Sequence, residues 1–310
     1  MRINRTLRDD RLMKGLTGMT VPEFNDLGKD FGQELEKEEE SKYKTELKKS
    51  NRQRKPGGGR KGELRTVYDK LFFVLFYFKC YPTFDLMGFV FGMNRSNACR
   101  NVHKFTPLLE RTLGETMILP KRKIRTTEEL FEMFPEVRDL IIDATERPIQ
   151  RPKDKEEQKK NYSGKKKRHT KKNTIVAGED KEIRYLGPTV EGKKHDYGSF
   201  KDEFPTESPG KPPPENRRFW TDLGYKGIEK DYPWLNVIQP RKKPRGGNLT
   251  EDEKIVNKLI SGIRVKVEHA IGGVKRFEIV SKVFRNRRDG FDDKAMVISC
   301  GLWNYHLLSR

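Results

Sequence analysis

The order of the elements predicted after residue 120 constrains this chain more than any other feature of its sequence. Before that point the apolar residues have helical spacing. Beyond it they gather into short runs typical of buried strands. These runs lie at 136–149, 173–179, 182–192, 217–228 and 234–242, with a short helical segment at 195–204 before the fourth run and longer ones from 251 onward. The pattern predicts a mixed α/β domain that follows a helical region.

Three sequential strands, a helix, a fourth strand and later helices form the element order of a ribonuclease-H-like fold. In that order, an acid on the first strand, one after the fourth strand and one on a late helix meet at one edge of the sheet. The first predicted strand has its core at Leu140 to Ile142 and ends at Asp143, and the fourth ends at Asp222. The sequence therefore predicts a ribonuclease-H-like α/β domain with an all-α region before it.

The late helical segment RVKVEHAIGGVKRF places Arg264, Glu268 and Lys275 four and seven residues apart, so the three side chains share one helix face. A carboxylate between two cations suits a divalent metal bound against a phosphodiester. The simpler interpretation is an exposed ion pair between Arg264 and Glu268, which contributes only about 0.3–0.5 kcal/mol. Gly272-Gly273 weakens that interpretation, because glycine inside a helix usually allows DNA or a neighbouring strand to approach closely.

Charge indicates a polyanionic partner. The 310 residues carry a net charge of +20, and only 33% are hydrophobic. Basic residues cluster at 52–62, 159–172 and 241–247, all predicted loops. Nucleic acid fits them better than a membrane surface, since no basic amphipathic helix stands out. The candidate phosphate contacts in the last two clusters are Lys165, Lys166, Lys167, Arg168, Lys242, Lys243 and Arg245.

Other features place the protein among soluble, intracellular proteins. The longest apolar run, LFFVLFYF at 71–78, is too short to span a bilayer, and the N-terminus has no apolar signal region. Cys80, Cys99 and Cys300 have no zinc-ligand spacing, so we expect buried free thiols in a reducing compartment.

The first 118 residues divide at a glycine-rich basic linker. Residues 1–62 are predicted to form a charged helical arm, with Thr20 and Glu23 as a capping box, followed by that linker. Residues 63–118 contain three predicted helices, the second capped by Thr83 and the third by Asn94, with a possible interruption at Pro107. A helix-turn-helix with base-reading residues such as Arg95 and Arg100 fits this pattern, and a plain three-helix bundle is the alternative.

With these motifs in place, the chain resembles a DDE transposase of the bacterial IS5 family, in the group whose nuclease domain is shared with Harbinger-type elements. The matching stretches are DATERPIQRP, YSGKKKRHTKK, HDYGSF, DLGYKG, RVKVEHAIGGVKRF and FRNRR, and they cover about 140–290. The family's spaced Tyr, Arg, Glu and Lys signature is matched except at Ser261, where Tyr is expected. This departure affects the tyrosine's supporting role and leaves the acidic residues intact.

The resemblance implies that Asp143, Asp222 and Glu268 form an acidic triad holding two Mg²⁺ or Mn²⁺ ions in a catalytic domain at 119–310. Asp196 competes for the second position, although it could simply be the N-cap of its helix. Arg264 and Lys275 would hold phosphates near the scissile bond. The implied partners are duplex DNA at the element's inverted repeats and at the target, with at least two protomers joined on DNA in a bacterial cytoplasm and associated with the nucleoid. A non-enzymatic derivative and a nuclease that never joins ends remain the alternatives.

Overall fold

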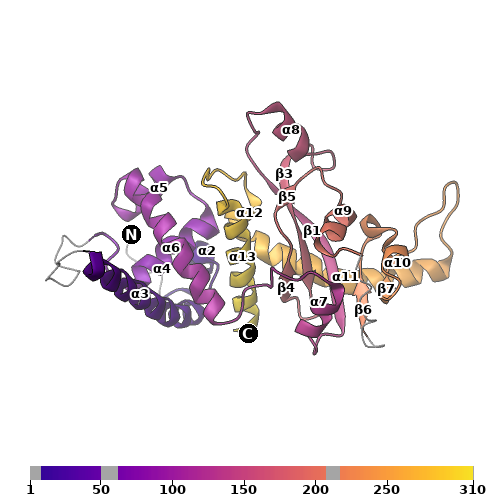
Figure 1. Ribbon diagram of the computed structural model, residues 1–310, viewed down its shortest axis with the longest axis horizontal. Coiled ribbons are helices and arrows are strands. Elements are labelled where there is room, and N and C mark those ends of the chain that lie inside the picture. The colour runs from indigo at the N-terminus through magenta and orange to yellow at the C-terminus, as the bar shows by residue number, and fades with distance from the viewer. Residues whose placement is uncertain (1–7, 50–61, 207–216, 310) are drawn as a thin grey trace. The chain divides into compact units, whose positions relative to one another are not determined.

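The computed structural model describes residues 8–49, 62–206 and 217–309, and it divides into two compact units. The helical unit comprises residues 1–119 with 276–279 and 308–310, and the mixed unit comprises 120–275 with 280–307. Figure 1 labels most of the helices and strands of both units.

The helical unit is built around one fully buried helix, α4. Every residue of α4 from Leu71 to Phe78 is buried, as expected of a helix that is apolar on all sides. Helices α2 and α3 pack against α4, and α6 packs against α3, α4 and α5. The helices of the unit are α2 (Asp10–Thr17), α3 (Val21–Lys49), α4 (Val67–Cys80), α5 (Phe84–Phe91) and α6 (Arg95–Glu115).

The helix starts in this unit follow the predicted caps. Thr20 and Glu23 bond each other's backbone N–H groups in the predicted capping box. Thr83 accepts from the N–H of Leu86, and Asn94 accepts from the N–H of Asn97. Between α5 and α6 the chain turns at Gly92, whose φ of 67° favours glycine. Helix, tight turn and helix confirm the expected helix-turn-helix geometry.

Some details of this unit differ from expectation. The N-terminal segment packs on α4: Phe24, Leu27 and Phe31 of α3 are fully buried, and the Phe24 ring lies 6.3 Å from that of Phe72. Pro107 lies inside a continuous α6 and does not interrupt it. The basic linker at 52–62 falls almost entirely outside the described residues.

The cysteines are also less buried than predicted. All three are free, but Cys80 and Cys99 are only half-buried, and Cys300 alone is buried.

In the described part of the chain, no helix combines the length and apolar character needed to cross a membrane.

The mixed unit contains the sheet. Its strands are β1 (Asp139–Pro148), β2 (Tyr162–Ser163), β3 (Arg168–Ala177), β4 (Ile183–Leu186), β5 (Val190–Glu191), β6 (Arg218–Trp220) and β7 (Val237–Ile238). Its helices are α7 (Thr127–Met133), α8 (Lys155–Asn161), α9 (Asp196–Glu203), η1 (Leu223–Tyr225), α10 (Ile228–Asp231), α11 (Glu251–Lys275) and α13 (Phe291–Leu308). The boundary between the two units in the sequence falls within α12 (Glu278–Ser281).

The strand order is β2-β3-β1-β6-β7, with β4 and β5 also paired to β3. β1 and β3 are antiparallel, as are β3 and β4, whereas β1, β6 and β7 run parallel. Antiparallel hairpins followed by parallel strands reached through helices give a curled mixed sheet. This arrangement confirms the predicted ribonuclease-H-like α/β fold.

Several boundaries in the sheet differ from those predicted. β1 does not end at Asp143 but continues to Pro148, and its far half pairs with β3. The basic segment predicted as one loop contains the end of α8, β2, a four-residue turn and the start of β3. Cross-strand pairing, which neighbouring residues do not encode, extends these strands.

The two faces of the sheet have different roles. Ile142 of β1 and Val176 of β3 belong to a core with α7, α9, η1 and α10, where Phe200 is fully buried. Because side chains alternate along a strand, Asp143 faces the other side, and α11 packs against β1. The first predicted acid therefore lies on the face that carries the predicted catalytic helix.

Candidate active site

Asp143 lies on β1 just beyond the last residue that pairs with β6. The parallel register ends at Ile141 opposite Trp220, so Asp143 stands where the two strands separate. One carboxylate oxygen accepts from the N–H of Ala144 at 2.8 Å. The pKa of Asp143 is raised to about 6, mainly by burial and also by the charges of Asp222 and Asp196, whereas the hydrogen bond from Ala144 and the charge of Arg264 lower it. A buried carboxyl among other carboxylates is a position where a cation is favoured.

Asp222 follows β6 by two residues and begins the motif DLGYKG. Its carboxylate accepts from the N–H of Gly224 at 2.8 Å and caps the single turn η1. A Cβ on Gly224 would lie 2.8 Å from that same oxygen, so only glycine leaves the cap undisturbed. Gly227 has a φ of 104°, in the region that favours glycine. The motif's glycines thus hold the Asp222 carboxylate at the end of β6.

Asp196 has a different environment. It is the first residue of α9, whereas His195 is the N-cap and makes no side-chain cap hydrogen bond, so the N-cap interpretation of Asp196 is wrong. Its carboxylate pairs with the Nζ of Lys172 at 2.6 Å, and Glu146 lies 3.9 Å from the same nitrogen. Lys172 and Glu146 are cross-strand partners on the sheet face opposite to Asp143.

Helix α11 carries the three residues of the predicted charged face. Arg264 is half-buried and close enough to Asp143 to lower the pKa of that carboxyl. Its Nε is buried with no hydrogen-bond partner among the described residues, and these residues contain no ion pair between Arg264 and Glu268. The surface ion-pair interpretation is therefore wrong. Glu268 itself is exposed.

Lys275 ends α11. Burial lowers its pKa, the nearby Lys166 lowers it further, and the charge of Asp143 opposes both. Lys166 in the turn between β2 and β3, Lys275 at the end of α11 and Asp143 are therefore close enough to interact electrostatically. A phosphate would relieve the repulsion between the two lysines.

The glycine pair in α11 has another explanation than the one predicted. A Cβ on Gly273 would lie 2.2 Å from the ring of Trp303 on α13, whereas a Cβ on Gly272 would meet nothing within 4 Å. The close approach at Gly273 therefore comes from a side chain of this chain. It concerns only the second glycine.

Tyr225 is a residue of the site that the sequence did not reveal as functional. It is fully buried in the core beneath the acids, and its hydroxyl has no hydrogen-bond partner among the described residues. Burial raises its pKa well above the usual value, and the charges of Asp196, Asp143 and Asp222 raise it further. The motif DLGYKG gives the only signal, since Tyr225 follows Asp222 by one helical turn.

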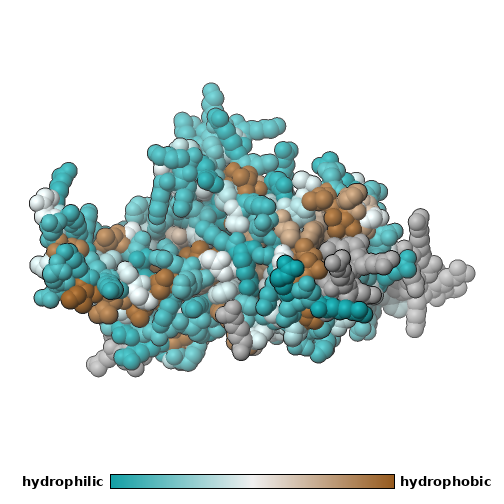
Figure 2. All heavy atoms as spheres, turned by 180° about the vertical axis from the view of Figure 1, so that it is seen from behind, coloured by the Kyte–Doolittle hydropathy of each residue, from teal (hydrophilic) through white to brown (hydrophobic). Residues whose placement is uncertain are grey.

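The remaining candidate DNA contacts are exposed. Lys165, Lys166 and Lys167 form the turn between β2 and β3, and Arg168 begins β3. Lys242, Lys243 and Arg245 lie in the loop between β7 and α11. Arg95 and Arg100 lie in the first turns of α6. The Nε of Arg95 is 3.8 Å from a carboxylate oxygen of Asp85, and the guanidinium of Arg100 donates to the side-chain oxygen of Asn97. Hydrophilic residues cover much of the face seen in Figure 2.

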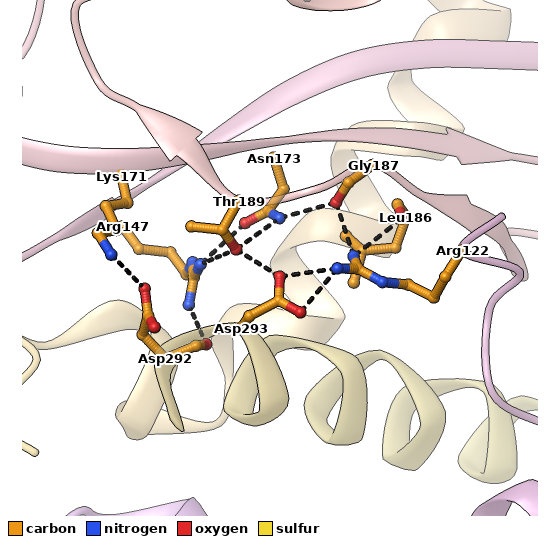
Figure 3. Close-up of polar contacts among 9 residues, drawn as sticks. All are labelled: Arg122, Arg147, Lys171, Asn173, Leu186, Gly187, Thr189, Asp292 and Asp293. Carbon is orange, nitrogen blue, oxygen red and sulfur yellow. Dashed lines mark hydrogen bonds and ion pairs between the residues drawn. The ribbon is translucent and has the colours of Figure 1, made fainter. Parts of the chain in front are cut away.

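A buried polar network holds the strand that carries Asp143 (Figure 3). Arg147, four residues farther along β1 on the same face, donates to the backbone oxygen of Asp292 at 2.6 Å and to Asn173 at 2.9 Å. Arg122 makes two hydrogen bonds to the carboxylate of Asp293. The network joins β1 and β3 to the start of α13. The sequence alone does not reveal it, because its partners lie up to 171 residues apart.

The donor chemistry fits a divalent cation even though the side chains are not gathered around one. Among the described residues, no three His, Cys, Asp or Glu side chains are close enough together to hold a metal ion. Asp143 and Asp222 supply hard carboxylate oxygens, and a cation would favour the ionised form of Asp143, whose pKa burial raises. Hard oxygen donors of this kind favour Mg²⁺ or Mn²⁺ over zinc, which prefers sulfur and imidazole ligands.

Comparisons with known proteins agree with this geometry. The family described as DDE superfamily endonuclease matches residues 142–304, and the helix-turn-helix of DDE superfamily endonuclease matches residues 63–115. The chain belongs to the DDE superfamily of endonucleases. It is 32% identical over 266 residues to a probable transposase for insertion sequence element IS702 of Microchaete diplosiphon, covering 86% of this chain and 89% of that protein. No solved structure matches the chain significantly.

Family membership settles the general character of the protein. It is a transposase-type nuclease with a DDE endonuclease domain and an N-terminal DNA-binding helix-turn-helix. Endonuclease domains of this superfamily use divalent metal ions. The plain three-helix bundle and the non-enzymatic derivative are thereby set aside.

Proposed function

We propose that this protein binds the ends of its own mobile element, cleaves a DNA strand there and joins the freed 3′ end to target DNA. Asp143, Asp222 and Glu268 act as the metal-binding acids. The observation that carries the proposal is the position of Asp143 and Asp222 at the point where β1 and β6 separate, with Arg264 of α11 beside Asp143. Helix α11 also carries Glu268, whose exposed side chain lies about one helical turn from Arg264.

Two Mg²⁺ ions, with Mn²⁺ as a substitute, would activate the attacking oxygen and stabilise the leaving one. The protein's own groups do the rest. Arg264 holds a non-bridging phosphate oxygen at the scissile bond, and its buried Nε gains a hydrogen-bond acceptor when it does. Lys275 and Lys166 neutralise the adjoining phosphate.

Asp222 is a better second ligand than Asp196. The carboxylate of Asp196 is already satisfied by Lys172 on the opposite sheet face. The carboxylate of Asp222 instead accepts from the N–H of Gly224 at the end of β6, a single neutral donor that leaves lone pairs for a metal ion. Removing Asp196 would leave Lys172 and Glu146 as a pair. The role proposed for Asp196 is therefore to position the β3 side of the site.

The two units divide the work in this proposal. Residues 63–118 recognise the element's terminal repeats, and residues 119–310 carry the chemistry. Joining two ends to one target requires at least two protomers, so we propose a dimer or larger assembly on DNA. Both steps use the same acids, since the second replaces water by a 3′-hydroxyl.

Single replacements that keep side-chain shape test the acids. Asp143→Asn, Asp222→Asn and Glu268→Gln should each reduce strand cleavage by about 10²–10³-fold or more, because a metal's Lewis acidity is worth several kcal/mol and about 1.36 kcal/mol is tenfold in rate. Binding to end DNA should remain within a few-fold of the unmodified protein.

The assay uses labelled duplexes carrying an element end, with nicking and joining to a plasmid measured separately. Asp196→Asn is the matched control and should retain most of the cleavage. Wild-type cleavage by Asp222→Asn together with an inactive Asp196→Asn would reverse the assignment. Nicking without joining by the unmodified protein would reduce the function to that of a nuclease.

A further inference from the structure

A cleft in the segment formed by α8, β2 and β3 has no role in the site described above. It has a volume of about 520 Å³. Its lining residues are Arg151, Gln158, Lys159, Tyr162, His169 and Lys193. The segment is built on buried polar groups, with Asn161 and Ser163 on either side of Tyr162 almost fully buried. The cleft is thus part of an ordered structure and not a gap between loops.

The cleft is strongly basic. Three of its six lining residues are cations, and none of the described residues that line it carries a carboxylate. Lys159 pairs with the exposed Glu156 at 2.8 Å, but the described residues contain no ion pair of Arg151 or Lys193. Two hydrogen bonds from Arg151 to Gln158, at 3.0 and 2.8 Å, hold its guanidinium at the cleft. Such a fixed cation suits a phosphate group.

The cleft also has an aromatic wall. Tyr162 is 42% exposed, and its ring lies 5.6 Å from that of His169 in an edge-to-face arrangement. The two residues are cross-strand partners of β2 and β3, so their rings are held by backbone pairing. An exposed aromatic ring among cations is the combination by which proteins bind unpaired nucleotides, with the base stacked and the backbone neutralised.

We propose that this cleft binds an unpaired nucleotide of the DNA substrate, with its base against Tyr162 and its phosphate at Arg151 and Lys193. The volume lies within the range of about 300–1,000 Å³ that is usual for small-ligand sites. A base within the duplex cannot offer its face to Tyr162, because stacking covers it. The inference rests on the proposed function, since it assumes that the protein acts on DNA.

The place of the cleft in the sheet sets where this nucleotide lies. His169 is 175 − 169 = 6 residues along β3 from Ile175, the partner of Asp143, and on the same face. At a rise of about 3.4 Å per residue the separation along the strand is roughly 20 Å. That corresponds to on the order of six stacked nucleotides from the scissile phosphate, so the base is held away from the reacting atoms.

The experiment uses the full chain and a set of end duplexes that differ in one position. Each duplex contains 2-aminopurine, either paired or unpaired as a one-nucleotide bulge, moved stepwise from two to ten nucleotides from the cleavage site. Binding is measured by anisotropy and stacking by quenching of the 2-aminopurine fluorescence. We expect the unmodified protein to bind one or two of the bulged duplexes about 5- to 100-fold more tightly than the paired duplex, with quenching.

Three variants separate the contributions. Tyr162→Leu should lose the preference and the quenching while binding paired duplex as before, and Tyr162→Phe should keep both. Arg151→Ala with Lys193→Ala should weaken binding to bulged duplexes most. A bulge preference at no position, or one that survives Tyr162→Leu, overturns the proposal. If paired end duplex is not bound at all, the proposed function fails instead, and the two failures are distinguishable.

Discussion

The two units differ in how their functional residues are brought into place. In the helical unit, each candidate DNA contact lies within one helix whose start is fixed by a neighbouring cap, as Asn94 fixes α6. In the mixed unit, Asp143 lies on β1, Asp222 follows β6 and Glu268 lies on α11, so a site that contains all three depends on the sheet and on the packing of α11. The candidate recognition residues are therefore local in sequence, whereas the proposed metal-binding acids are not. Substitutions should affect the two activities separately.

The largest separation should follow from changes in α6. Replacing Arg95 and Arg100 by Ala removes two exposed cations from its first turns, where a helix-turn-helix contacts base edges. The absence of either base interaction should cost about 1–3 kcal/mol, so preference for element ends over random duplex should fall by roughly 10- to 100-fold or more. Competition binding with the two duplexes measures this.

Lys104→Ala is the matched control, because Lys104 is an exposed cation farther along the same helix, beyond its first turns. It should change affinity for both duplexes equally. A double variant that still discriminates as well as the unmodified protein would show that recognition does not lie in α6.

The basic turn of the mixed unit should give an effect of the opposite kind. Replacing Lys165, Lys166, Lys167 and Arg168 by Ala should weaken binding to all duplexes alike. The slope of log K against log salt should fall by up to about 4 × 0.9, or about 3.6, because each phosphate interaction contributes about 0.9. Sequence preference should survive, since interactions with the DNA backbone do not read bases.

A titration at three salt concentrations measures that slope. The same replacement of Lys242, Lys243 and Arg245 shows whether the second exposed loop lies on the DNA path too. An unchanged slope in the first variant means that the turn between β2 and β3 is only solvated.

The same contrast explains what could be predicted from the sequence. Caps at Thr20, Thr83 and Asn94 predict the helix starts correctly because the physical cause lies within four residues. The element order predicts the ribonuclease-H-like sheet. The extension of β1 to Pro148, the start of β3 at Arg168 and the Arg147 network depend on partners far along the chain, which periodicity does not reveal.

The candidate site shows this limit most clearly. The positions of Asp143 and Asp222 relative to the strands could be predicted, because Asp143 directly follows a buried apolar run and Asp222 lies just beyond another. Lys172 as the partner of Asp196, and Trp303 as the reason for Gly273, were not, because each contact joins separate elements. Tyr225 looks like any core aromatic in sequence, and only its orphaned hydroxyl beside the acids distinguishes it among the described residues.

A third prediction concerns the cost of placing Asp143 in the sheet. Its pKa is raised from 3.8 to about 6 in the folded protein, so the folded state binds the proton more tightly than the unfolded state. The free energy of unfolding should therefore fall as pH rises through that interval, and the loss should be complete above about pH 6. Asp143→Asn removes this cost and should raise the free energy of unfolding by about 1–3 kcal/mol in metal-free buffer at about pH 7.5.

Urea unfolding in EDTA at about pH 4 and about pH 7.5 tests the sign. The variant and the unmodified protein should be nearly equal at the lower pH and differ at the higher one. Added Mg²⁺ should stabilise the unmodified protein more than the variant. A variant that is less stable at the higher pH would show that the ionised carboxylate is satisfied by groups already in the site.

The smallest expected effects come from the two adjacent glycines of α11. One should respond to helix propensity alone, and the other to packing against a residue far along the chain. Gly272→Ala should stabilise the protein by about 0.5–1 kcal/mol, since a Cβ there meets nothing within 4 Å and alanine favours the helix. Gly273→Ala should destabilise it by about 1–3 kcal/mol, because its Cβ would lie 2.2 Å from the Trp303 ring. Both are measured by urea unfolding. If both variants gain stability, the Trp303 ring can move aside, which would show that α13 packs loosely on α11. If both variants lose stability, the helix propensity of alanine does not decide the outcome at Gly272. Prediction from neighbouring residues, which succeeds for the helix starts of the helical unit, would then fail within α11.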